Sequence, residues 1–300
     1  MSAGVDYETV FMNSPIPPSS FPFLPPSSLP LSSPSPAAAK RGKYQTTQRF
    51  KDSSKKLLLC HDFRGNYLND RYACLPLSCF HLSPHLTFLP FLPLLHSSSP
   101  TLAVRWINGS EYNNSYEVTD WSLVDIFCYF SHEFITIPPD SWISTCRQHG
   151  AQIIGTVITE WENGARVCQE LFQSLESAQH AANYLIQLAI DTQIDGWLIN
   201  IENPIPLDLI DNLKVFLSTL TQGMHSALGD QSQVIWYDAV TIEGKLRWQD
   251  GLTSLNKPFF DLCDGIFINY TWKDDSIATT LDTLAGSDNL FPLVLSLLLL

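Results

Sequence analysis

An amide and a carboxyl group lie two residues apart where the apolar run DGWLINIEN (195–203) ends, at Asn200 and Glu202. Side chains alternate between the two faces of a β-strand, so these polar groups share one face and the large apolar residues share the other, which must face helices. A carboxyl group in an apolar-walled pocket has a raised pKa and stays protonated often enough to act as a general acid. The run therefore predicts a strand whose carboxyl end forms an active site.

The strand face that carries Glu202 restricts the chemistry open to it. This face holds no second carboxylate on the same strand, and ordinary glycosidases need two. Substrate-assisted glycosidases use the 2-acetamido oxygen of the sugar as the nucleophile, and the amide of Asn200 is suited to orient such a group. A structural alternative stays open, in which both residues are a buried polar pair that is hydrogen-bonded to neighbouring strands.

Alternating strand and helix patterns surround this run. Apolar residues with helical spacing occur over 178–188 and 210–224, and each set predicts a helix with one apolar stripe. Six β-rich runs are expected as strands, at 57–63, 124–130, 151–158, 195–202, 233–240 and 265–270. Near-continuous apolar strands separated by helices are typical of an α/β protein with a parallel sheet covered by helices.

Two α/β architectures fit this order of elements, an open doubly wound sheet and a β/α barrel. The sequence CHDFRGNYLND, which follows the first strand, holds one glycine, so the glycine-rich dinucleotide fingerprint is absent. Its absence favours a TIM-type (β/α)8 barrel, in which the chemistry takes place at the carboxyl ends of the strands. With about six of the eight strands in view, we expect the barrel to be incomplete.

Composition narrows the class of function and the compartment. The chain has 300 residues and a net charge of −13, which argues against nucleic acid as a partner because binding it needs a basic face. Its seven cysteines form no CxxC pair and no His/Asp cluster of metal-ligand type is visible, so we expect reduced thiols and no metal or other cofactor. The amino terminus MSAGVDYETVF lacks the features of a secretory signal, which favours the cytosol.

The domain organisation follows from shifts in composition. Residues 1–50, with nine prolines between 13 and 40, are predicted to be a disordered Pro/Ser-rich segment. Residues 51–287 form the predicted partial barrel, interrupted over 74–100 by an atypical apolar insertion whose prolines disfavour stable membrane insertion. Residues 288–300 are expected to be an aberrant apolar tail that is too short to span a bilayer.

Seven short motifs occur in a consistent order and together closely resemble the endo-β-N-acetylglucosaminidases of glycoside hydrolase family 85. The motifs are CHDFRGNY (60–67), YFSH (129–132), TEW (159–161), DGWLINIEN (195–203), WYDAV (236–240), LRWQD (246–250) and NYTW (269–272). The resemblance covers roughly residues 50–73 and 120–285. It implies a cytosolic enzyme that acts on an N-glycan or glycopeptide, hydrolyses the β-1,4 bond between the two core GlcNAc units and passes through an oxazoline intermediate.

The same resemblance assigns catalytic roles to three residues of these motifs. It implies that Glu202 protonates the oxygen of the leaving GlcNAc and afterwards deprotonates a water molecule. It also implies that Asn200 holds the 2-acetamido group for attack, while Tyr237 steadies the same group. All three would lie at the carboxyl ends of strands, where a barrel carries its chemistry.

Six further residues of the motifs are expected to bind the sugar. They are Trp161, Trp248, Trp272, Asn269, His61 and Tyr129. The tryptophans can pack against the CH groups of a sugar face, but core packing stays open as the alternative role for each of them. For the histidine, the commoner role is structural.

Two departures from the family keep other functions open. Residues 74–100 match nothing in the family, and after Ser287 the family-like sequence stops before the expected seventh and eighth strands. One alternative is therefore a catalytically inactive truncated isoform that binds glycan or a partner. Another is a chitinase-like hydrolase, whose DxxDxDxE strand has an Asp where this chain has Asn200.

Overall fold

The computed structural model describes residues 57–62, 74–75, 118, 120–285 and 297–298. The predicted disordered segment at 1–50 lies outside the described residues. So do almost all of the predicted insertion at 74–100 and of the predicted tail at 288–300, apart from two residues in each. The expectations for these three segments therefore stay predictions.

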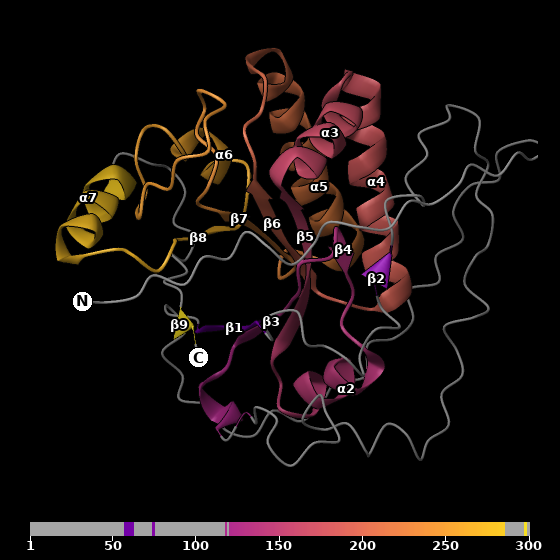
Figure 1. Ribbon diagram of the computed structural model, residues 1–300. Helices are drawn as coiled ribbons and strands as arrows, with labels where there is room; N and C mark the ends of the chain where they lie inside the picture. Colours follow the sequence, from indigo (N-terminus) through magenta and orange to yellow (C-terminus); the bar gives the residue numbers. More distant parts are fainter. Residues whose placement is uncertain (1–56, 63–73, 76–117, 119, 286–296, 299–300) are drawn as a thin grey trace, which may run out of the picture. The chain divides into compact units, whose positions relative to one another are not determined.

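Six parallel strands form the body of the sheet, and they confirm the six expected runs (Figure 1). They are β1 (Leu58–Asp62), β3 (Ile126–Phe130), β5 (Gln152–Glu160), β6 (Gly196–Glu202), β7 (Gln233–Tyr237) and β8 (Gly265–Phe267). The strand order is β8-β7-β6-β5-β3-β1. Three two-residue strands extend the sheet, namely β2 (Cys74–Leu75), β4 (Ile135–Thr136) and β9 (Leu297–Leu298). Within the described residues β8 does not pair with β1, so the parallel strands form an open part of a β/α barrel.

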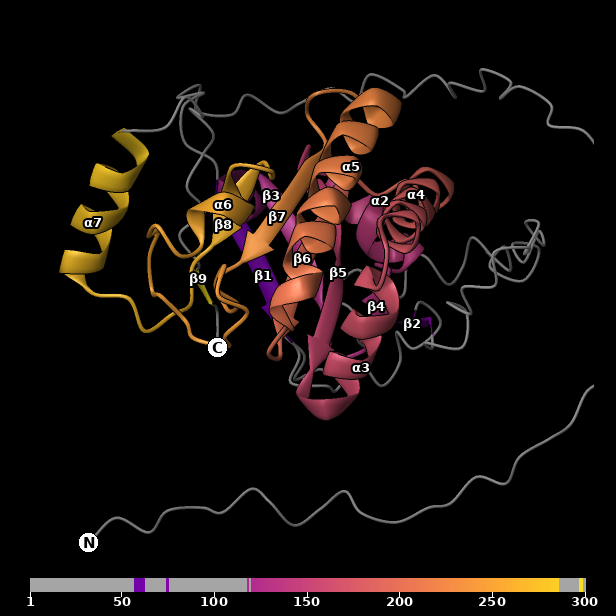
Figure 2. The ribbon, with the colours of Figure 1, turned by 90° about the horizontal axis from the view of Figure 1, so that it is seen from above.

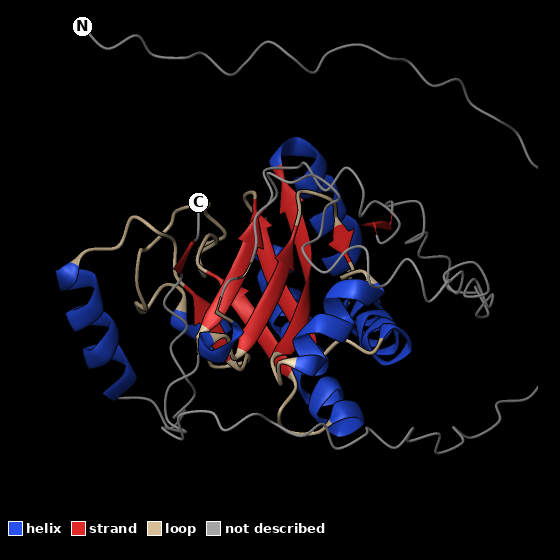
Figure 3. Ribbon diagram, turned by 90° about the horizontal axis from the view of Figure 1, so that it is seen from below, coloured by secondary structure: helices blue, strands red, loops and turns tan. Residues whose placement is uncertain are grey.

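Most helices lie between successive parallel strands in the chain and cover one face of the sheet, whereas the last helix follows β8 and stands apart from the sheet (Figures 2 and 3). They are η4 (Trp121–Leu123), α2 (Asp140–Gln148), α3 (Trp161–Phe172), α4 (Leu175–Thr192), η5 (Leu207–Leu209), α5 (Ile210–Leu228), α6 (Lys257–Phe260) and α7 (Asp274–Ala285). Helix α4 begins with a capping box between Ser174 and Ser177 and is capped at its carboxyl end by Gln193, whose backbone is left-handed. Both expected apolar stripes are buried where α4 packs against α5. Among the described helices, none is both long and apolar enough to cross a membrane.

Two apolar clusters lie on opposite sides of the sheet, and β6 contributes to both. Trp197, Ile199 and Ile201 pack in the larger cluster with the helices. Leu198 packs in the smaller cluster on the other face, together with inward residues of the neighbouring strands. The expected alternation along β6 is therefore confirmed, and it places Asn200 and Glu202 on the face away from the helices.

An aspartate directly precedes every second parallel strand and joins it to the strand before it in the chain; two of the three are buried and Asp125 is partly buried. The carboxylates of Asp125, Asp195 and Asp264 accept hydrogen bonds from the backbone N–H groups of Leu57, Ile153 and Val234, at 2.8, 2.9 and 2.8 Å. Such a hydrogen bond to a charged group stabilises a fold by about 1.5–3 kcal/mol. These bonds fix the amino ends of the strands, which leaves the carboxyl ends to carry functional groups.

Candidate active site

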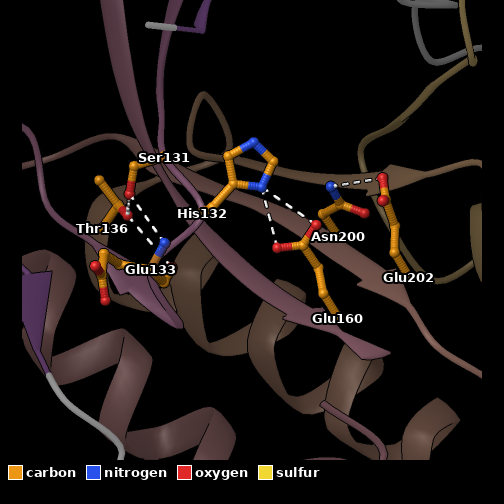
Figure 4. A network of polar contacts seen from close by, with 7 residues as sticks. All are labelled: Ser131, His132, Glu133, Thr136, Glu160, Asn200 and Glu202. Atoms are coloured by element: carbon orange, nitrogen blue, oxygen red, sulfur yellow. Dashed lines mark hydrogen bonds and ion pairs between the residues drawn. The ribbon is translucent and has the colours of Figure 1, made fainter. Parts of the chain in front are cut away.

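Asn200 and Glu202 come together at the carboxyl end of β6, as the spacing predicts. Nδ2 of Asn200 donates a hydrogen bond of 3.2 Å to Oε1 of Glu202 (Figure 4). Burial raises the pKa of the Glu202 carboxyl, and the hydrogen bond from Asn200 offsets part of that rise. A carboxyl group with a raised pKa retains its proton to higher pH and can deliver it to a leaving group.

The amide oxygen of Asn200 is a buried acceptor that has no hydrogen-bond partner among the described residues. The side chain is 2 % exposed, so neighbouring protein atoms shield it from solvent almost completely. An unsatisfied buried acceptor costs about 1–3 kcal/mol, and such exceptions in native structures call for an explanation. A ligand N–H at this position would satisfy the oxygen, and the N–H of a 2-acetamido group has the required chemistry.

A second carboxylate, Glu160, faces the same site from the neighbouring strand. The register of β5 and β6 pairs Glu160 with Glu202, and the like charge of Glu160 further raises the pKa of Glu202. Nδ1 of His132 lies 3.0 Å from Oε2 and 3.2 Å from Oε1 of Glu160 (Figure 4). The absence of a second carboxylate holds for β6 alone, and Glu160 is not among the site residues predicted from the sequence. The signal for Glu160 and for His132 is the position of TEW and YFSH at the ends of adjacent strands.

Tyr237 ends β7 and takes part in a polar network that orients its phenol. Its Oη donates a hydrogen bond of 3.2 Å to Oδ1 of Asn269, and Nδ2 of Asn269 donates at 2.9 Å to Asp250 and at 2.9 Å to Thr271. Burial raises the pKa of Tyr237, and the charge of Glu202 adds to that rise. The phenol therefore remains a neutral hydrogen-bond donor that faces the carboxyl of Glu202.

Large apolar side chains are exposed in the segments that follow four successive strands, at the carboxyl side of the sheet. They are Trp161 after β5, Leu207 after β6, Trp248 after β7 and Tyr270 after β8, with exposed fractions of 80, 70, 40 and 60 %. The backbone of Trp161 has a φ of 58°, a left-handed conformation that is uncommon for a residue other than glycine. Exposed aromatic rings around polar groups are suited to stacking on flat ligand faces. Tyr270 is not among the site residues predicted from the sequence.

Comparison with known proteins identifies the family of the chain. The sequence profile of Glycosyl hydrolase family 85 matches residues 99–291, which is more than half of the chain. The chain belongs to glycoside hydrolase family 85. This membership confirms the resemblance carried by the seven motifs.

Named relatives and a solved structure agree with this membership. The chain is 44 % identical to cytosolic endo-beta-N-acetylglucosaminidase 1 of Arabidopsis thaliana over 220 residues, which are 73 % of this chain and 27 % of that protein. It is 37 % identical to cytosolic endo-beta-N-acetylglucosaminidase of Homo sapiens over 223 residues, 74 % of this chain and 25 % of that protein. The chain thus spans about a quarter of the length of these relatives. The glycoside hydrolase domain of Endo-D from Streptococcus pneumoniae R6 shares the fold, with a TM-score of 0.50 at 18 % identity over 81 % of this chain and 33 % of that one.

Two motif residues of this family 85 chain lie away from the Asn200–Glu202 face. His61 and Tyr129 are paired in register and point to the helix side of the sheet. The ring of His61 lies 5.1 Å from that of Trp142 and 5.6 Å from that of Phe127, and burial lowers the pKa of His61 to about 4. The structure does not bring either residue to Glu202, and the placement favours structural roles for both. The sequence does contain a signal for this placement. His61 and Tyr129 directly follow Cys60 and Cys128, whose side chains face inward, and successive side chains of a strand point to opposite faces.

The three tryptophans that were predicted to bind the sugar lie in two different places in this family 85 chain. Trp248 is close enough to Tyr237 for hydrogen bonding to its side chain to lower the phenol pKa slightly. Trp161 stands at the end of β5, next to Glu160. Trp272 instead packs, partly buried, against the helix-side cluster. The structure therefore brings two of the three tryptophans to the carboxyl side of the central strands, and Trp272 to the edge of the helix-side cluster.

A buried carboxylate in the WYDAV motif holds the loop that carries Trp248. Asp238 is 1 % exposed, and its Oδ1 accepts a hydrogen bond of 2.8 Å from Nδ2 of Asn256. Its Oδ2 accepts one of 3.0 Å from the backbone N–H of Gln249. Burial raises the pKa of Asp238 to about 6, although the two hydrogen bonds act in the opposite direction and lower it.

We expect Asp238→Asn to change how the stability of the protein depends on pH. A folded-state pKa above the usual 3.8 means that the stability contributed by Asp238 is full below pH 3.8 and is lost as the pH rises through about 6. A rise of two pKa units corresponds to at most about 3 kcal/mol between these limits. Urea unfolding of the variant at pH 4 and pH 7 should therefore show a smaller fall in the free energy of unfolding than the wild type. Asp230→Asn, on the surface after α5, removes the same charge and should follow the wild type; equal slopes for all three proteins would contradict the assignment.

Proposed function

We propose that this chain is the catalytic part of an endo-β-N-acetylglucosaminidase that hydrolyses the β-1,4 bond between the two core GlcNAc residues of N-glycans by substrate-assisted catalysis. One observation carries the proposal. The unpartnered amide oxygen of Asn200 lies on the same strand end as a carboxyl group of raised pKa, in a chain of family 85. This pair matches what the reaction needs, an acceptor for the acetamido N–H and an acid for the leaving oxygen.

In the first step Glu202 donates its proton to the glycosidic oxygen, and the bond from that oxygen to the anomeric carbon breaks. The acetamido carbonyl oxygen of the same sugar forms the new bond to this carbon and closes an oxazoline ring, which stays protonated at nitrogen. Oδ1 of Asn200 accepts the acetamido N–H, which orients the carbonyl oxygen and increases its nucleophilicity. The neutral phenol of Tyr237 steadies the acetamido group from the neighbouring strand.

In the second step the Glu202 carboxylate accepts a proton from a water molecule. The water oxygen attacks the anomeric carbon, and the bond from this carbon to the oxazoline oxygen breaks. Because each step inverts the anomeric centre once, the product retains the β configuration. Glu202 ends the cycle protonated, as it began.

The aromatic rim supplies the proposed binding surface for the glycan. Trp161 and Trp248 offer exposed indole faces at the ends of β5 and β7, and Asn269 positions Tyr237 through its carbonyl oxygen. Contacts from His61, Tyr129 and Trp272 would require the sugar to reach the helix-side face or the core, so they contribute through packing. The substrate is an N-glycan or glycopeptide. The cytosol is the proposed compartment, because the matched relatives are named as cytosolic enzymes.

Replacing the acetamido group of the reacting GlcNAc by a trifluoroacetamido group tests the mechanism without any mutation. Fluorine withdraws electron density from the carbonyl oxygen that acts as the nucleophile, so kcat should fall by about tenfold or more, the equivalent of about 1.4 kcal/mol in the barrier. An unchanged kcat would place the nucleophile on the protein and contradict the proposal. Glycan binding by the folded chain without cleavage of either substrate would support the inactive-isoform alternative.

A further inference from the structure

The ion pair of His132 and Glu160 lies beside Glu202, but neither step of the proposed reaction uses it. Glu160 ends β5 in register with Glu202, and paired positions on adjacent strands lie about 5 Å apart. Both carboxylate oxygens of Glu160 face Nδ1 of His132, at 3.0 and 3.2 Å. The side chain of Glu160 is 18 % exposed and that of His132 is 49 % exposed. The carboxylate therefore lies mostly inside the protein, and the imidazole lies at its surface.

We propose that Glu160 and His132 form a positioning pair that governs whether Glu202 is protonated: Glu160 favours the protonated form, and His132 holds Glu160 in place and offsets the effect of its charge on Glu202. The inference rests on the proposed function for the role of Glu202. Its geometry stands on the β5–β6 register and on the two short contacts between imidazole and carboxylate. Figure 4 shows the imidazole beside Glu160, and Glu160 beside the Asn200–Glu202 pair.

The charged and titratable groups that face Glu202 come from three elements of the described structure. Strand β5 contributes Glu160, the segment after β3 contributes His132 and β7 contributes Tyr237. The phenol is neutral, and Asn200 on β6 itself is an uncharged donor. The charges that act on Glu202 therefore come from the carboxylate of Glu160 and, when it is protonated, the imidazole of His132.

The two members of the pair act on Glu202 in opposite directions. A negative charge at Glu160 disfavours a second negative charge on Glu202, whereas a positive charge on His132 favours it. Before bond cleavage Glu202 must hold a proton, and after cleavage it must exist as a carboxylate. Because the effects of the two residues on the pKa of Glu202 oppose each other, the pair is compatible with both the protonated and the charged state of Glu202.

Carbon-13 NMR of the full chain, labelled at the Glu carboxyl carbon, tests the pair without requiring turnover. The resonance of Glu202 is assigned by its loss in Glu202→Gln, and its titration midpoint is then followed in each variant. Glu160→Gln should lower the midpoint by about one pH unit, as expected for the loss of a like charge a few ångströms away. His132→Gln keeps a hydrogen-bonding side chain but removes the positive charge, and it should raise the midpoint by about half a unit.

Glu133→Gln is the matched control, because it removes the same charge from the residue next to His132. Glu133 is exposed and points away from Glu202 (Figure 4). Its loss should leave the midpoint of Glu202 unchanged. The proposal is overturned if Glu160→Gln leaves the midpoint unmoved, if Glu133→Gln shifts it equally, or if His132→Gln shifts it in the same direction as Glu160→Gln.

The same variants separate this inference from the proposed function. If the chain turns over, the alkaline limb of the kcat/KM profile should move down in pH for Glu160→Gln and up for His132→Gln. A merely structural role would lower activity equally at all pH values. Opposite shifts of the NMR midpoint in a folded chain that cleaves no glycan would sustain the pair and count against the proposed function alone.

Discussion

Glu202→Gln is expected to reduce kcat/KM for an N-glycan core by about 10³-fold or more, because general acid–base catalysis by one positioned group contributes about 10²–10⁴-fold. Gln has nearly the same shape and can still accept the hydrogen bond from Asn200. It can neither donate a proton to the leaving oxygen nor accept one from water. Both steps of the reaction therefore lose their proton transfer, while binding of the glycan should change little.

Initial rates with a fluorescent Asn-linked high-mannose glycopeptide measure this effect. Glu133→Gln removes a carboxylate from the adjacent exposed segment and should stay within about twofold of the wild type, as surface changes usually do. Thermal unfolding of Glu202→Gln should match that of the wild type, which would show that the loss is chemical. If Glu202→Gln keeps a tenth or more of the wild-type rate, Glu202 is not the general acid and base of the reaction.

Asn200→Ala is expected to lower kcat on the glycopeptide by about 10²-fold, because orientation of a reacting group commonly contributes several kcal/mol. The variant loses the amide oxygen that would accept the acetamido N–H, so the carbonyl oxygen is no longer held for attack. A synthetic oxazoline of the same glycan already contains the bond that this step forms. Consumption of the oxazoline should therefore fall much less than cleavage of the glycopeptide.

The ratio of these two rates is the measurement that assigns the role of Asn200. A large loss on the glycopeptide with a small loss on the oxazoline assigns Asn200 to formation of the intermediate. Equal losses on both substrates would mean that Asn200 acts mainly by supporting Glu202, to which it donates a hydrogen bond. That outcome would contradict the proposed contact with the acetamido group.

The alternation along β6 could be predicted from sequence because the period of a strand is a local property. Apolar Trp197, Ile199 and Ile201 on one face fix Asn200 and Glu202 on the other. The same rule applied to β1 and β3 would have placed His61 and Tyr129 on the helix side, away from Glu202. The prediction that both residues bind sugar used their position near strand ends and left out which face of the strand each side chain occupies.

The TEW motif places Glu160 at a strand end, but its contact with Glu202, like the role of Asp238, depends on contacts between distant segments. Glu160 meets Glu202 only through the register of two strands that are separated by α3 and α4. Asp238 acquires its raised pKa from burial beneath a loop that returns through Gln249 and Asn256. A single sequence specifies neither the register nor the path of that loop.

The mass of the peptide product formed by the wild-type chain tests the central claim most directly. The chain is incubated with an Asn-linked high-mannose glycopeptide, and the products are analysed by mass spectrometry. Cleavage between the two core GlcNAc residues leaves a peptide that carries one GlcNAc, which is the result that the Asn200–Glu202 site predicts. A peptide without GlcNAc, or intact glycopeptide after incubation with a folded chain, would contradict it.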